Sequence, residues 1–167
     1  PREFGLVGMI SIFLAISQTF TDSGFGNALI RKKDCTENDY STVFYFNLAV
    51  GILFSFLLFI SAPAISRFFT EPQLIDLVRV LSLGLIINSF TIIQRTILVK
   101  RIDFKLQTKI SLIASICSGA ISIFLAYNGF GVWSLVVRSL TNSFFNSLLL
   151  WIWNRWIPML VFSYESF

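Results

Sequence analysis

The residues best suited to chemistry form a polar stripe late in an otherwise apolar chain. Arg138, Asn142 and Asn146 recur at every fourth position, and serines at 139, 143 and 147 accompany them. Side chains four residues apart lie on one face of an α-helix. A guanidinium binds phosphate oxygens through paired hydrogen bonds, and amides bond to hydroxyl groups or water. The stripe therefore predicts a polar surface suited to an anionic ligand, a lipid phosphate or pyrophosphate.

A second polar stripe lies near the beginning of the chain. Gly8, Ser11, Ala15, Gln18 and Asp22 share one helical face, and the other faces are apolar. Polar groups in a membrane-spanning helix turn toward the helix bundle, so Gln18 and Asp22 are predicted to line its interior. In a second interpretation Asp22 only caps the helix that follows, a role in which aspartate is favoured.

Two arginines occupy positions where a membrane would surround them. Arg138 lies about 9 Å inside its predicted span, at 1.5 Å per residue, and exposure of its charge to lipid there is costly. Arg79 lies near the outer end of another span, where Glu71 or Asp76 could pair with it. Both arginines are therefore candidate ligand-binding residues. The alternative for Arg138 is that it reaches outward to the interface and that the asparagines and serines only hold helices together.

The elements that must position these residues are membrane-spanning helices. The chain has 167 residues, of which 55% are hydrophobic and 13% charged, whereas a soluble domain has about 25% charged residues. About 20 apolar residues are needed to cross the hydrocarbon core as a helix. Five predicted spans meet this length, at about 4–21, 43–65, 74–99, 109–127 and 132–153. We therefore predict an all-α, polytopic bundle that forms one transmembrane domain over residues 1–167.

The basic residues of the connecting segments predict the orientation. One side of the predicted bundle carries Arg31, Lys32, Lys33, Lys100, Arg101, Lys105, Lys109 and Arg155, and the other carries Arg2 and Arg67. Cytoplasmic loops are enriched in lysine and arginine, so the first set is predicted to be cytoplasmic. The chain begins with PREFG at the mouth of a span, which favours an internal fragment of a longer protein.

The composition argues against several classes of active site. The chain has no histidine and only two cysteines, Cys35 and Cys117, so it offers no zinc-ligand spacing and no histidine-based triad. The motif GFG at 24–26 does not match a phosphate-binding loop. The net charge of +4 is concentrated in the predicted cytoplasmic loops and reflects topology, not nucleic-acid binding. We therefore expect a non-enzymatic protein without metal or cofactor.

Several segments, in order along nearly the whole chain, resemble one known family. These are PREFGLVGMISIFLAI, FTDSGFGNALIRKKD, DYSTVFYFNL, APAISRFFTEPQL, RVLSL, KRIDFK, GFGVWSLV and WIPMLVFS. They are similar to the polysaccharide flippases of Wzx type, the lipopolysaccharide biosynthesis proteins of the multidrug/oligosaccharidyl-lipid/polysaccharide exporter superfamily. The resemblance implies part of the N-terminal lobe of a larger, two-lobed transporter in the bacterial inner membrane.

The same resemblance implies a function. Such a protein would move an undecaprenyl-pyrophosphate-linked oligosaccharide to the periplasmic leaflet, for lipopolysaccharide, capsule or exopolysaccharide biosynthesis, by alternating access between its lobes. Its expected partners are the lipid-linked oligosaccharide, membrane lipids and other polysaccharide assembly proteins. Within this scheme Arg138 and Arg79 would attract the pyrophosphate. Asn142, Asn146 and Gln18 would contact sugar hydroxyls or water.

Two other functions stay open. A multidrug or cation exporter of the same superfamily would share the fold but should place acids in its cavity, and Asp22 is the sole candidate for that role. A membrane-embedded glycan polymerase or glycosyltransferase should carry carboxylates in its spans or a large loop outside the membrane. The distribution of acids in loops disfavours both alternatives.

Overall fold

Four long helices make up most of the computed structural model. It describes residues 35–158, together with positions 5, 8, 11, 12, 15–17, 19, 29 and 30. The helices are α3 (Glu37–Phe69), α4 (Leu74–Lys100), α5 (Phe104–Tyr127) and α6 (Val132–Asn154), and all four are long and apolar enough to cross a membrane. No described residue belongs to a strand. The all-α prediction is therefore confirmed for this part of the chain.

The predicted spans from 43 onward each lie within one helix. Helices α3 and α5 begin before the predicted spans, because the polar residues that precede each apolar segment also form helical turns. Thr36 and Asp39 explain the early start of α3. The Thr36 hydroxyl accepts a hydrogen bond from the Asp39 amide, and the Asp39 carboxylate accepts one from the Thr36 amide. This reciprocal capping arrangement stabilises the first helical turn.

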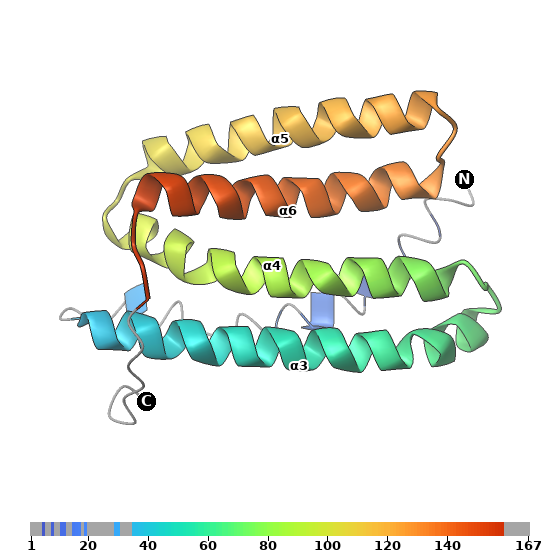
Figure 1. Cartoon of the computed structure of the whole chain (residues 1–167), viewed down its shortest axis with the longest axis horizontal. Helices are drawn as coiled ribbons and strands as arrows, with labels where there is room; N and C mark the ends of the chain where they lie inside the picture. Colours follow the sequence, from blue (N-terminus) through green and yellow to red (C-terminus); the bar gives the residue numbers. More distant parts are fainter. Residues whose placement is uncertain are drawn as a thin grey trace.

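The short turn between α5 and α6 depends on glycine. Gly129 has φ +80° and Gly131 has φ +49°, a left-handed region that residues with a side chain rarely occupy. Asn128 closes the end of α5, because its side-chain amide donates to the carbonyl oxygen of Phe124 at 2.8 Å. The turn brings α6 back antiparallel to α5, as Figure 1 shows.

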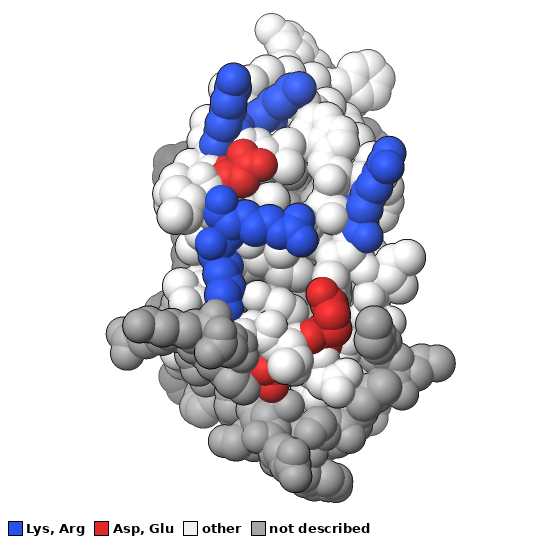
Figure 2. All heavy atoms as spheres, turned by 90° about the vertical axis from the view of Figure 1, so that its left-hand side faces the viewer, with Lys and Arg blue, Asp and Glu red and all other residues white. Residues whose placement is uncertain are grey.

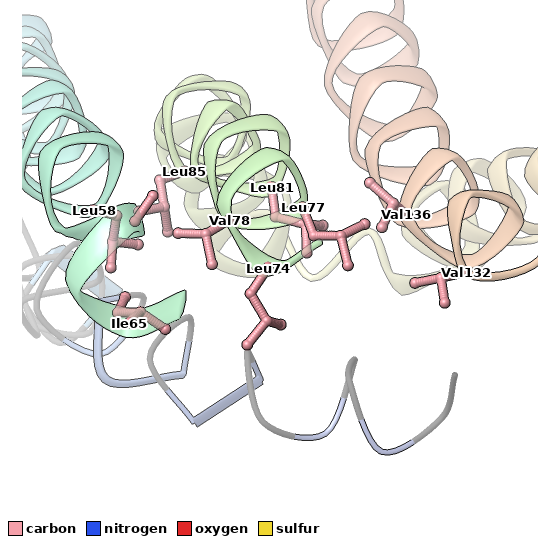
Figure 3. Packing of buried hydrophobic residues seen from close by; sticks show 10 residues of the cluster. Leu58, Ile65, Leu74, Leu77, Val78, Leu81, Leu85, Val132 and Val136 are labelled. Carbon is pink, nitrogen blue, oxygen red and sulfur yellow. The ribbon is translucent and has the colours of Figure 1, made fainter. Parts of the chain in front are cut away.

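The four helices lie side by side in the order α5, α6, α4, α3, with α4 between α3 and α6 (Figure 1). A buried cluster at the end where α4 begins holds three of them together. Figure 3 shows side chains of α4 between those of α3 and α6. The labelled members are Leu58, Ile65, Leu74, Leu77, Val78, Leu81, Leu85, Val132 and Val136. Their packing makes α4 the central element of the described bundle.

Close approach of α3 and α4 depends on small residues. Gly51 of α3 lies against Ser89 of α4, where a β-carbon at position 51 would collide with the serine hydroxyl. Ser89 donates its hydroxyl hydrogen to the carbonyl oxygen of Leu85 at 2.9 Å, so it is satisfied within its own helix. Small residues of this kind let helix backbones approach closely in membrane proteins.

Candidate functional site

The predicted polar stripe lies on α6 and is most exposed near the beginning of that helix. Arg138 is exposed, and Asn142 and Asn146 are half-buried. Asn146 donates a side-chain hydrogen bond to the carbonyl oxygen of Asn142 at 3.2 Å. The side-chain oxygen of Asn142 is buried and accepts no hydrogen bond from any described residue. The stripe thus combines an accessible cation with an acceptor that is not satisfied within the described chain.

Neighbouring positions of α6 serve different purposes. Leu140 packs toward α4, where a β-carbon at Gly84 would lie 3.3 Å from one of its methyl groups. Phe144 and Leu148 are exposed and, with Trp151, line an apolar groove of about 620 Å³. The helix therefore has a packing face, an apolar open face and the polar stripe. This division matches the expectation that a membrane helix separates its polar side chains from lipid-facing ones.

Arg79 of α4 contacts an aromatic side chain of α3 and does not belong to the α6 stripe. Its guanidinium carbon lies 4.8 Å from the ring centre of Phe59 in α3, a distance at which a cation is attracted to the ring face. Its Nε–H is buried and finds no acceptor among the described residues. No hydrogen bond or ion pair links Arg79 to Glu71 or Asp76 within that part of the chain, so the expected carboxylate partners do not pair with it there.

The two arginines nevertheless lie at similar depth. Arg79 is five residues after Leu74, where α4 begins, and Arg138 is six residues after Val132, where α6 begins. At 1.5 Å per residue these positions lie about 8 and about 9 Å from the same end of the bundle. Because α4 and α6 are neighbours that run in the same direction, both cations belong to one zone of the protein (Figure 1). Gln18 and Asp22 lie outside the described residues.

A partly buried polar cluster at the opposite end of the bundle was not predicted. Asn154 donates to the Gln94 side-chain oxygen at 2.6 Å, and Gln94 donates to the Trp156 carbonyl oxygen at 3.0 Å. The Trp156 indole donates to the Glu37 carboxylate at 2.6 Å, and Arg101 donates to the Asn154 side-chain oxygen at 3.4 Å. Gln94 and Asn154 are 60 residues apart, and no periodicity within one helix links them.

The serines of α5 divide between two environments. Ser118 and Ser122 are buried, and Ser122 donates to the Ser134 carbonyl oxygen of α6 at 3.1 Å. Serines at 111, 115, 118 and 122 share one helical face, and the two buried ones form a close-packing surface against neighbouring helices. Ser111 and Ser115 are exposed within the described chain and line a groove. Within the described residues, α6 therefore covers only part of this face of α5.

Basic residues gather at one end of the bundle. Figure 2 shows Lys and Arg side chains over the end where α3 and α5 begin and where α4 and α6 end. The described basic residues at these helix ends are Lys100, Arg101, Lys105, Lys109 and Arg155. Lys109 lies over the Trp153 ring at 5.0 Å, so part of this charge rests on aromatic residues at the same level. Such a belt is typical of the boundary between membrane and cytoplasm.

The four apolar helices and the polar stripe define a multi-pass membrane protein with ionisable groups inside its spans. Comparison with known proteins assigns the particular family. The family model described as "Polysaccharide biosynthesis protein" matches residues 1–167, and the chain belongs to this family. The resemblance found in the sequence is therefore confirmed.

Curated relatives agree with this assignment. The chain is 31% identical over 148 residues to the teichuronic acid biosynthesis protein TuaB of Bacillus subtilis, covering 87% of the chain and 31% of the relative. It is 26% identical to the succinoglycan biosynthesis transport protein ExoT of Rhizobium meliloti, covering 99% of the chain and 33% of the relative. For the lipopolysaccharide biosynthesis protein WzxC of Escherichia coli the identity is 24%, over 99% of the chain and 34% of the relative.

The chain spans about a third of the length of these relatives. No solved structure gave a significant match.

Proposed function

We propose that this chain is part of a longer protein, called the parent below. The parent is a flippase that moves a lipid-linked oligosaccharide across the bacterial inner membrane during polysaccharide biosynthesis. The observation that carries the proposal is the match of the polysaccharide biosynthesis family over the whole chain. ExoT is named a transport protein, which supports transport as the form that this role takes. The chain then acts as a non-enzymatic part of a transporter.

The α6 stripe supplies the chemistry that such a substrate needs. Arg138 offers an accessible guanidinium within a membrane helix, where its attraction for an anion is stronger than in water. The unsatisfied Asn142 oxygen accepts hydrogen bonds, which suits sugar hydroxyls or ordered water. In the proposed role Arg138 binds the pyrophosphate, and Asn142 and Asn146 contact the polar head.

Arg79 takes a supporting part in the proposal. Its guanidinium lies on Phe59 between α3 and α4, and a rearrangement of these helices would be needed to free it for a ligand. Transporters with two lobes alternate between states in which such interfaces change. Gln18 and Asp22 are proposed to line the same cavity from the first predicted span, and the rest of the parent protein closes it.

The test is export of glycan to the cell surface by the full-length parent with Arg138→Leu, in cells that lack the native copy. Export should fall roughly tenfold or more, as expected from the loss of one charge-assisted contact of about 1.5–3 kcal/mol. Arg155→Leu is the matched control, because Arg155 is also exposed but lies beyond the end of α6. Undiminished export by Arg138→Leu at equal protein level contradicts the proposed role.

A further inference from the structure

A second cationic site lies in a groove between α4 and α5. The groove has a volume of about 490 Å³ and is lined by Arg95, Gln107, Thr108, Ser111, Leu112 and Ser115. Arg95 is exposed into it, and no described residue forms an ion pair or hydrogen bond with its guanidinium. The groove is thus lined by five residues with polar side chains and by one leucine, and its one cation has no partner in the described chain.

The chemistry of the lining favours a phosphate group. An arginine fork donates two parallel hydrogen bonds to phosphate oxygens. Gln107 and Ser111 add donors from α5, and neither side chain is engaged by another described residue. Thr108 uses its hydroxyl hydrogen on the Phe104 carbonyl oxygen at 2.9 Å, which leaves it as an acceptor. Three donor side chains therefore converge on one small volume.

The surrounding charge strengthens this preference. Between positions 95 and 115 the sequence has the basic residues Arg95, Lys100, Arg101, Lys105 and Lys109. Asp103 is the single acid in that interval, and its carboxylate is engaged in capping α5 through the Leu106 amide at 3.0 Å. Figure 2 shows the resulting concentration of basic side chains at this end of the bundle. The groove therefore lies in a region of positive potential, which attracts anions.

Depth and neighbours indicate a lipid as the source of the phosphate. Arg95 lies five residues before the end of α4 and Thr108 four residues after the start of α5, about 6 to 8 Å from the helix ends. A long arginine side chain reaches back from this depth to the interface, where lipid phosphates lie. Farther along α5, Leu112 and Ile116 are 56% and 63% exposed, so an apolar surface continues from the polar groove toward the membrane centre.

We infer that this groove binds the phosphate of an anionic membrane lipid, with Arg95 as the anchoring cation and the α5 residues Gln107 and Ser111 as hydrogen-bond donors. The acyl chains then lie along Leu112 and Ile116. This site is separate from the α6 stripe, because its lining residues belong to α4 and α5 and none belongs to α6. The inference goes beyond the proposed transport and does not depend on it.

The experiment measures lipid binding to the purified full-length parent by native mass spectrometry. Phosphatidylglycerol and phosphatidylcholine with identical acyl chains are added in parallel. The wild type should retain phosphatidylglycerol in preference to phosphatidylcholine. Arg95→Gln should weaken phosphatidylglycerol binding roughly tenfold or more, the loss expected for a charge-assisted contact. Arg95→Lys should retain part of the affinity, because it keeps the charge but loses the fork.

Arg155→Gln is the matched control for charge at the same end of the bundle, and it should bind like the wild type. Soluble glycerol 3-phosphate distinguishes the two sources of phosphate. Failure of millimolar glycerol 3-phosphate to displace the lipid supports a lipid site, and full displacement assigns the groove to free phosphate compounds instead. Equal binding by Arg95→Gln and the wild type, or equal retention of both lipids, overturns the inference. None of these readouts depends on glycan export.

Discussion

Gln94 and Asn154 form the closest polar connection between α4 and the end of α6 that the structure describes. The Asn154 amide donates to the side-chain oxygen of Gln94 at 2.6 Å and to its backbone oxygen at 3.3 Å. Gln94 is fully buried and Asn154 is 8% exposed. A buried amide that loses its partner retains the cost of its removal from water. The pair therefore stabilises the way in which α6 and the segment after it dock on α4.

Asn154→Leu is predicted to lower the stability of the detergent-purified parent by about 1–3 kcal/mol, because the buried side-chain oxygen of Gln94 loses its donor and Arg101 loses its acceptor. Thermal unfolding measures this effect. Asn38→Leu is the control, since Asn38 is exposed in the first turn of α3. A double change with Gln94→Leu should cost less than the sum of the single changes. Strict additivity would show that the two residues do not act together.

The contact between Gly51 and Ser89 predicts a strong difference between two glycine substitutions. Gly51→Ala should destabilise the protein by about 1–3 kcal/mol, because the added methyl group forces α3 away from α4. Gly119→Ala should be neutral or stabilise by up to about 1 kcal/mol, because open space surrounds it and alanine favours the helix. Thermal unfolding of both variants checks this, and similar effects at the two sites would contradict the close packing of α3 on α4.

The two arginines of the proposed site are predicted to respond differently to removal. Arg79→Ala should lower both stability and export, because it removes the contact with Phe59, which is worth about 0.5–2 kcal/mol. Arg138→Ala should lower export while stability stays close to that of the wild type, because Arg138 is exposed in the described chain. Export normalised to protein level, together with thermal unfolding, separates the two. Equal loss of stability in both variants would place Arg138 in a structural role.

The proposed cavity predicts a pattern of access to water along α6. After Cys35 and Cys117 are replaced, a charged, membrane-impermeant thiol reagent should label Arg138→Cys, Asn142→Cys and Asn146→Cys in the full-length parent. Leu140→Cys should resist labelling because this position packs against α4 near Gly84. Phe144→Cys should also resist labelling, because Phe144 lies on the apolar open face of α6 that is expected to meet lipid. Absence of labelling at all three stripe positions would mean that the polar residues only hold helices together.

The amino-acid sequence by itself determined the helical architecture. Apolar segments of about 20 residues have few stable alternatives to helices in a membrane, so the positions of the spans from 43 onward follow from composition and length. The sharing of one helical face by Arg138, Asn142 and Asn146 also follows from local periodicity. The order of short segments was enough to indicate the family that the whole-chain match assigns.

Only the tertiary structure decided which faces of the helices are covered. Ser111 and Ser122 share one helical face of α5, yet the first lines a groove and the second bonds to α6. Arg79 meets Phe59 instead of a carboxylate, and Gln94 meets Asn154 across 60 residues. The physical reason is that periodicity within a helix fixes which side chains share a face, whereas the neighbour at that face depends on how separate helices pack.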